Sequence, residues 1–163
     1  MNKTFLSLLG ALLCVTTLYA ATIHVSPGSG TIKTAVGNAS AGDVLLLSDG
    51  EYSESSVKPA VPLTIKAAEN THPVIMLSSR FEVMSDFTIE GVKIQSTAEA
   101  IRMVNASTPY NVTVKDCELS GCPGKYIRAY TSDATAPYIN KLTVFNCIFR
   151  MEKPAEENAP RAI

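Results

Sequence analysis

The sequence predicts an all-β solenoid, and two features support that prediction. The first is a five-residue phrase that occurs four times, beginning at Leu63, Phe87, Val112 and Leu142. Each copy has an apolar residue, a threonine and a β-branched apolar residue in succession, and the starts lie 24, 25 and 30 residues apart. Self-similarity at such a period is typical of solenoid folds. The second is that three copies end on Gly, Asp or Asn, which tolerate a left-handed turn.

Residues 1–20 have the pattern of a secretory signal peptide. A basic Lys3 precedes the apolar run from Phe5 to Val15, and small residues follow at Ala20 and Ala21. We expect cleavage after Ala20 and a mature protein that is secreted, periplasmic or held at the cell surface. The apolar run is shorter than the ~20 residues that a bilayer requires, so we expect no membrane span.

The mature chain is expected to form one domain over residues 21–151, followed by a disordered tail at 152–163. That tail is polar and contains Pro154 and Pro160, which argues against a packed structure. The formal net charge of −1 argues against a nucleic-acid partner, because phosphate binding needs a basic face. His24 and His72 do not stand at a ligand-like spacing from Cys122, so the residues themselves predict no metal site.

The mature chain should begin with a strand at 22–25 and a short amphipathic helix. Thr31 is the expected N-cap of this helix, and Gly42 the expected end. A strand buried on both faces follows, between the turn dipeptides at 42–43 and 49–50. The apolar residues that share one face at helical spacing are Ile32, Ala35, Val36 and Ala39.

This amino-terminal region carries a family resemblance. The helix with small residues, Ala41-Gly42-Asp43, the aliphatic run, Asp49-Gly50-Glu51-Tyr52 and then Leu63-Thr64-Ile65-Lys66-Ala67-Ala68 follow one another. This order resembles the start of secreted right-handed parallel β-helix proteins of the chondroitinase B and alginate lyase type, within the pectate-lyase-like superfamily. The resemblance covers roughly residues 23–149 and implies a right-handed parallel β-helix of about four coils, capped by the amino-terminal helix. Because such lyases usually continue for many more coils, we expect this chain to be either a truncated product or an N-terminal fragment.

Each coil should contain three short strands. The expected first strands lie at 81–84, 100–104 and 126–130, and the four phrases form the second strands. The expected third strands lie at 74–77, 92–94, 117–119 and 147–149. This register predicts four stacked core ladders: Phe87, Val112 and Leu142; Ile89, Val114 and Val144; Val92, Cys117 and Cys147; and Ile94, Leu119 and Phe149.

The ladder positions make Cys117 and Cys147 neighbours, either as two buried thiols or as a disulfide. Gly91, Asp116 and Asn146 occupy equivalent turn positions after the second strands, and Ala67 departs from them, so the first such turn should differ. The helix can cover the first coil, but nothing comparable covers the last. We therefore expect self-association through the last coil.

The same register predicts a polar strip on the outer face of the first strands. If Ile101 and Ile127 point inward, Arg102 and Arg128 point outward on adjacent coils, with Glu82 one coil earlier. Tyr130 and Lys125 should lie nearby. Two guanidiniums one strand spacing apart repel each other unless an anion bridges them.

Two interpretations of this strip remain open. In one, it is a solvated charged face in which Glu82 neutralises Arg102. In the other, Arg102, Arg128 and Lys125 bind the carboxylates of an acidic polysaccharide, and Tyr130 stacks on a sugar ring. The resemblance supports the second interpretation, because it implies a substrate groove along this sheet.

The sequence gives no catalytic motif. The resemblance implies lyase chemistry with Lys and Arg for proton transfer, and in many members calcium held by Asn and Glu, but no phrase here resembles a calcium-binding set. The leading expectation is a lyase-like protein that binds or cleaves uronate-containing polysaccharide. The alternative is a non-catalytic cell-surface or carbohydrate-binding module. A polygalacturonase-like hydrolase ranks last, because the first strands have no clustered aspartates.

Overall fold

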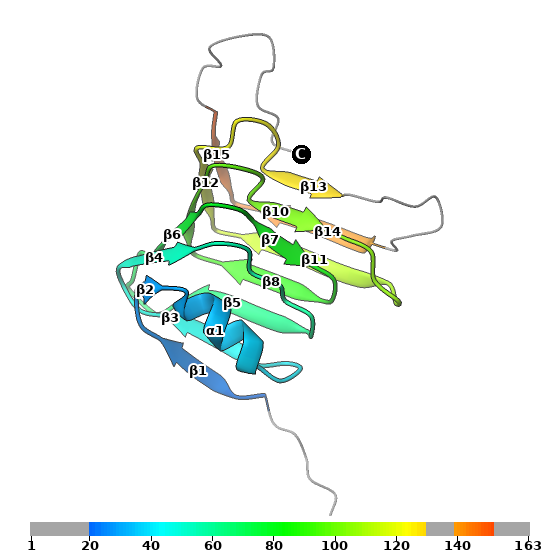
Figure 1. Cartoon of the computed structure of the whole chain (residues 1–163), viewed down its shortest axis with the longest axis horizontal. Coiled ribbons are helices and arrows are strands. Elements are labelled where there is room, and N and C mark those ends of the chain that lie inside the picture. The colour runs from blue at the N-terminus through cyan, green and yellow to red at the C-terminus, as the bar shows by residue number, and fades with distance from the viewer. Residues whose placement is uncertain (1–19, 130–138, 152–163) are drawn as a thin grey trace, which may run out of the picture.

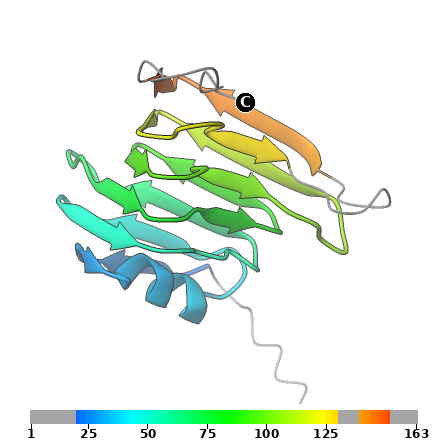
Figure 2. The ribbon, with the colours of Figure 1, turned by 45° about the horizontal axis from the view of Figure 1, so that its top comes forward.

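The computed structural model describes residues 20–129 and 139–151, and over these residues the chain winds into a parallel β-helix (Figure 1). The predicted right-handed parallel β-helix with one short helix is confirmed. Figure 2 shows the coils stacked in chain order, with the helix at one end of the stack and the last strands at the other. The leader expected at residues 1–20 lies outside the described residues apart from Ala20.

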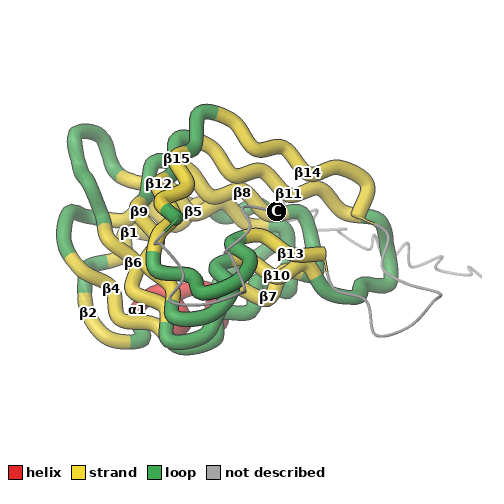
Figure 3. Tube along the Cα trace, turned by 90° about the horizontal axis from the view of Figure 1, so that it is seen from above, coloured by secondary structure: helices red, strands yellow, loops and turns green. Residues whose placement is uncertain are grey.

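The described strands form three parallel sheets, named A, B and C here, which enclose the interior when the molecule is seen along the stack (Figure 3). Sheet A has the order β1 (Thr22–Val25), β3 (Val44–Leu47), β5 (Leu63–Ala67), β8 (Phe87–Glu90), β11 (Tyr110–Lys115), β14 (Ile139–Phe145). Sheet B has the order β2 (Gly28–Ser29), β4 (Glu51–Glu54), β6 (Val74–Leu77), β9 (Lys93–Ser96), β12 (Glu118–Ser120), β15 (Ile148–Arg150). Sheet C has the order β7 (Phe81–Val83), β10 (Ile101–Met103), β13 (Ile127–Ala129).

The four copies of the repeated phrase form neighbouring strands of sheet A and pair in register. Their first residues pair from coil to coil in the order Leu63, Phe87, Val112 and Leu142, and their third residues pair in the order Ile65, Ile89, Val114 and Val144. These residues point into the core, which confirms the first two predicted ladders. The threonines between them pair with each other on the outer face. The phrase therefore repeats because each coil needs the same two inward side chains at the same height.

The turn after each phrase has the expected left-handed backbone. The φ angles of Gly91, Asp116 and Asn146 are 73°, 53° and 49°. The Asn146 side-chain amide donates a hydrogen bond to Asp116 Oδ1 at 2.6 Å, so the turns are joined from coil to coil. Ala67 instead ends β5, and the positive φ moves to Asn70, at 59°. The expectation that this first turn differs is confirmed.

Three of the four third strands begin later than the sequence indicated, whereas β6 has the expected bounds of 74–77. Those expected at 92–94, 117–119 and 147–149 are β9, β12 and β15, each displaced by one residue at its start. The reason is that the residue after each left-handed position still completes the bend. Its carbonyl nevertheless joins the ladder, since the Glu118 N–H donates to the Val92 oxygen at 3.1 Å. The first strands are also shorter than expected, at three residues each.

The cysteines of the described residues, Cys117, Cys122 and Cys147, are free thiols. Cys117 and Cys147 precede paired residues of β12 and β15, as the ladder predicted. The Cys117 thiol donates to the Lys115 carbonyl oxygen at 3.1 Å, and burial raises its pKa to about 12. Of the two arrangements that the sequence left open, the structure has the pair of thiols, and Cys117 is packed as a small hydrophobic residue.

The helix α1 (Thr31–Asn38) packs its buried Ile32 against the first coil. The predicted N-cap was wrong: Gly30 occupies that position, and Thr31 is the first helical residue. Gly42 also lies beyond the end of the helix, which stops at Asn38. The cap comes instead from Glu54 on β4, whose carboxylate accepts the N–H groups of Ile32 and Lys33 at 2.8 and 3.3 Å.

Glu54 is only 4% exposed, and this burial raises its carboxyl pKa despite the two backbone donors and the Lys33 charge.

The last coil is less enclosed than the others. Its core residues Leu142, Val144 and Phe149 are only partly buried, and Phe145 and Ile148 are 60% and 53% exposed. Self-association through this coil stays a prediction. The tail expected to be disordered, 152–163, lies outside the described residues. Within the part of the chain that is described, no helix has the length and apolarity to cross a lipid bilayer.

Candidate functional site

Sheet C places the two predicted arginines beside each other. Arg102 on β10 pairs with Arg128 on β13 and with Glu82 on β7. The neighbouring residues of these strands, Ile101 and Ile127, are fully buried, so the arginines lie on the outer face. The predicted register of this sheet is therefore confirmed.

Glu99 is the anion between the two arginines. It lies in the turn just before β10, and its carboxylate accepts Arg102 Nε at 2.5 Å and Arg128 Nη1 at 2.8 Å. Arg80 Nη1 approaches the same carboxylate at 3.5 Å. One carboxylate from the chain itself thus offsets the repulsion between guanidiniums on adjacent coils.

One of the two interpretations of the strip gave Glu82 as the group that neutralises Arg102. Glu82 forms an ion pair with Lys58 at 2.9 Å, and a carboxylate that contacts Arg102 is that of Glu99. The contact of Glu99 with the arginines was not predicted, because Glu99 lies in a loop, where no periodicity indicates the direction of a side chain. The one available signal was its position three residues before Arg102.

The turn that carries Glu99 is held by the preceding strand. The Ser96 hydroxyl, at the end of β9, lies 3.3 Å from the Glu99 carbonyl oxygen and 3.1 Å from the Ser79 carbonyl oxygen. The Ala100 N–H then donates to the Tyr126 carbonyl oxygen of the next coil. The backbone on both sides of Glu99 is therefore fixed to neighbouring coils.

The arginines keep Glu99 ionised. Burial acts to raise the pKa of this carboxyl, whose side chain is 14% exposed, but the hydrogen bonds and charges of Arg102 and Arg128 outweigh burial and hold the pKa below its ordinary value. The carboxylate is therefore charged at neutral pH.

A hollow of about 370 Å³ opens beside this cluster. Among its described lining residues the charged side chains are Arg80, Arg102, Lys125 and Arg128, with Glu99 as the one acid, so four positive charges and one negative give a formal charge of +3. The hollow thus has a net positive charge in a chain whose total is −1. Lys125, predicted from sequence to lie near the arginines, is confirmed as their neighbour.

Solved structures resemble this arrangement of coils. No protein-family model matches the chain, and a search of curated proteins finds no match. The structure resembles the PL6 family alginate lyase AlyGC, with a TM-score of 0.63 and 24% identity over 80% of this chain. A point mutant of AlyGC gives a TM-score of 0.66 at the same identity and coverage. The chain spans about 20% of the length of these lyases.

The chain shares the parallel β-helix fold of these solved structures. The described residues offer no cluster for a calcium ion. No three His, Cys, Asp or Glu side chains converge there as metal ligands. The one carboxylate in the hollow is already held by guanidiniums, whose positive charge repels a cation, so this site does not fit calcium.

Two tyrosines and a cysteine lie close to these residues in the sequence. Tyr130, expected to stack on a sugar, lies outside the described residues. Tyr126 is fully buried, and its hydroxyl donates to the Arg150 carbonyl oxygen, so this side chain belongs to the core. Cys122 also lines the hollow, but it is buried and its thiol donates to the Lys125 carbonyl oxygen at 2.9 Å. Burial raises the pKa of this thiol, which disfavours the reactive thiolate.

Proposed function

We propose that this chain binds uronate-containing acidic polysaccharide at the hollow beside Glu99. The observation that supports this proposal is the way in which Arg102 and Arg128 together hold a carboxylate. The same two guanidiniums can share or exchange that carboxylate for one on a ligand, because Arg binds carboxylates in a fixed planar geometry. The +3 charge of the hollow then attracts a polyanion from a distance.

The fold favours a polysaccharide over a small anion. Sheet C runs across successive coils, and its outer face carries Arg102 and Arg128 on neighbouring strands about 4.8 Å apart. A linear polymer laid along the stack meets more than one coil. The solved structures compared above are of an alginate lyase and its mutant, and alginate is a polymer of uronic acids.

Binding, rather than cleavage, is the function that the described residues support. Elimination needs a base that removes the proton next to the carboxylate and a group that stabilises the resulting negative charge. The arginines suit the second task. Among the described lining residues of the hollow, Glu99 is the one carboxylate, and it is already held by Arg102 and Arg128. We therefore propose a non-catalytic carbohydrate-binding role for these coils.

Titration of the full chain with alginate, polygalacturonate and dermatan sulfate tests this function. At least one polymer should bind saturably at low salt, bind more weakly as salt rises, and yield no unsaturated uronate, which is followed by its ultraviolet absorbance with calcium present. Dextran, a neutral polymer, serves as the charge control. An increase in absorbance would show that the chain cleaves the polymer and is not merely a binding protein. Absence of binding to all three polyanions at low salt would refute the proposal.

We also propose that the chain is exported and begins at Ala21 after processing. In support, the Ala21 nitrogen lies 2.8 Å from Asp43 Oδ1. The backbone donors Ala21 and Ser40 lower the pKa of the Asp43 carboxyl, so it is ionised at neutral pH. Cleavage after Ala20 would convert this nitrogen into a terminal ammonium and the contact into an ion pair.

The intact mass of protein recovered from the periplasm of an expressing bacterium checks this prediction. The mass should correspond to a chain that starts at Ala21. Asp43→Asn should lower the melting temperature of that processed chain, whereas Asp49→Asn, which changes an exposed hydrogen bond to the His72 N–H, serves as the control. A mature chain that starts elsewhere, or that retains residues 1–20, contradicts the proposal.

A further inference from the structure

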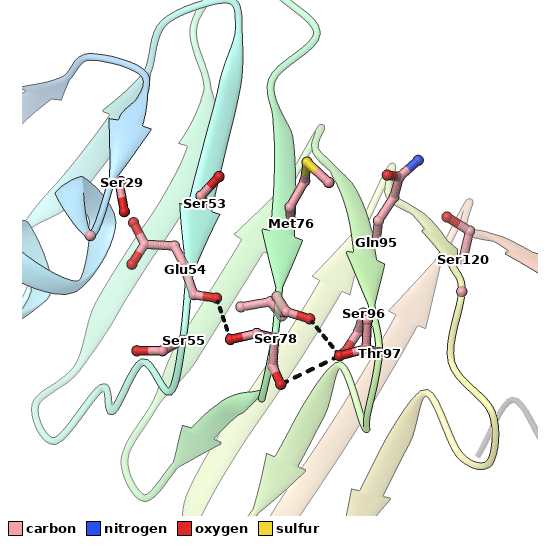
Figure 4. A pocket seen from close by; sticks show the side chains of 13 residues that line it. Ser29, Ser53, Glu54, Ser55, Met76, Ser78, Gln95, Ser96, Thr97 and Ser120 are labelled. Carbon is pink, nitrogen blue, oxygen red and sulfur yellow. Dashed lines mark hydrogen bonds between the residues drawn. The ribbon is translucent and has the colours of Figure 1, made fainter.

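A second hollow lies on sheet B and takes no part in the site beside Glu99. It has a volume of about 640 Å³ and crosses β2, β4, β6, β9 and β12 (Figure 4). We call it the serine groove. Its outer row consists of residues that pair directly from coil to coil: Ser29, Ser53, Met76, Gln95 and Ser120.

A second row runs beside the first, two residues further along each coil. It consists of Ser55, Ser78 and Thr97, which follow the ends of β4, β6 and β9. Hydrogen bonds tie this row to the coils, since the Ser78 hydroxyl donates to the Glu54 carbonyl oxygen at 3.3 Å and the Thr97 hydroxyl to the Ser78 oxygen at 3.4 Å. The two rows give the groove a repeating polar lining along the stack.

The serine groove is electrically neutral toward a ligand. Glu54 is the one charged side chain among its described lining residues, and its carboxylate is buried against the amino-terminal end of α1. The remaining polar groups are hydroxyls and the amide of Gln95, which both donate and accept hydrogen bonds. Sugar hydroxyls also donate and accept, whereas a polyanion would find no positive charge here.

Met76 supplies an apolar surface near the middle of the groove. Its side chain is 41% exposed, and Figure 4 shows it between Ser53 and Gln95. A thioether chain is flexible and polarisable, and it can pack against the C–H face of a sugar ring. Apolar contact in the centre with hydrogen-bonding groups on both sides suits a carbohydrate.

The direction of the serine groove favours a glycan over a peptide. An extended peptide usually binds by adding a strand to a free sheet edge. This groove instead crosses the strands of sheet B, whose backbone groups already pair with the neighbouring coils. A linear ligand along the stack meets side chains only, repeated about every 4.8 Å.

We propose that the serine groove binds a linear neutral polysaccharide whose chain runs along the stack of coils. The site is distinct from the hollow beside Glu99, since it lies on sheet B and its one charged side chain, Glu54, is buried against α1. The two sites lie on either side of the turn at 96–99, with Thr97 lining one and Glu99 the other. This inference does not depend on the binding of acidic polysaccharide.

A methyl signal gives a readout specific to the serine groove. The full chain is labelled with [13C-methyl]methionine, and Met76→Leu identifies the Met76 signal by its loss. Titration with short linear oligosaccharides of glucose, mannose or xylose should shift the Met76 signal saturably with at least one of them. The signal of Met103, which is 2% exposed in the core, should not move.

Two variants test the lining. Gln95→Glu and Ser53→Asp put a charge on the outer row without touching the core, and each should weaken binding of that oligosaccharide by about tenfold or more. Arg102→Ala with Arg128→Ala should leave the Met76 response unchanged, which separates this site from the hollow beside Glu99.

Three results would overturn the proposal. The first is no shift of the Met76 signal with any neutral oligosaccharide at millimolar concentration. The second is a shift that persists unchanged in both charged variants while their melting temperatures stay at the wild-type value. The third is a shift caused by an extended peptide or a uronate oligosaccharide, but by none of the neutral sugars.

Discussion

Replacement of both Arg102 and Arg128 by alanine is expected to lower the affinity for a uronate polymer about a hundredfold. A charge-assisted hydrogen bond contributes about 1.5–3 kcal/mol, so the loss of two gives about 3–6 kcal/mol. Both side chains are partly exposed, at 22% and 35%, which favours the lower end, and about 3 kcal/mol corresponds to a factor of about a hundred. Isothermal titration of both proteins at low salt measures the difference.

The matched control removes the same charge elsewhere. Lys66→Ala with Lys93→Ala takes two positive charges from sheets A and B and should change the affinity far less. Arg102→Lys with Arg128→Lys keeps the charge but loses the planar donor pair, so its affinity should fall between those of the wild type and the alanine variant. Equal loss in the control and the alanine variant would mean that net charge alone, and not this site, governs binding.

Glu99→Gln is expected to act in the opposite direction and tighten binding of the same polymer about tenfold. The substitution raises the formal charge of the hollow from +3 to +4 and removes the carboxylate that competes with the ligand. Glutamine keeps the shape and can still accept hydrogen bonds from the arginines. Unchanged or weaker binding would show that the main effect of Glu99 is to orient the guanidiniums and not to compete with the ligand for them.

The same variant should alter the pH dependence of stability. Because Arg102 and Arg128 hold the folded pKa of Glu99 below its ordinary 4.5, the unfolded chain binds this proton more tightly. The stabilisation is therefore fully present above pH 4.5 and is lost as pH falls through the lowered pKa. Melting temperatures from pH 7 to pH 3 should fall more steeply in the wild type than in Glu99→Gln. Parallel curves for the two proteins would exclude this linkage.

The register of the coils could be predicted because side-chain direction alternates along a strand. Once the phrases at Phe87 and Val112 were aligned, the inward positions followed, and so did the placement of Arg102 beside Arg128. This alignment is strongly favoured, because a slip by one residue would move all the inward apolar side chains of a strand to the solvent face. The four-fold pattern was therefore sufficient to predict the core residues and the position of the arginine pair.

The contacts made by turns could not be predicted in the same way. Glu99 and Lys58 lie in turns, where chain length and backbone conformation decide the direction of a side chain and no period constrains it. The cap of α1 was missed for a related reason, because the capping group is not local. The serine groove lies between these cases: its outer row follows the strand register, but its hollow shape depends on where the turns bend.

The carboxylate of Glu54 reaches α1 from 22 and 21 residues further along the chain. A helix of eight residues has a costly nucleus and little stability alone. Its first turn thus lacks these acceptors until the second coil has docked. The helix therefore gains its cap only when β4 has docked, and the amino-terminal end of the stack should form no earlier than the second coil.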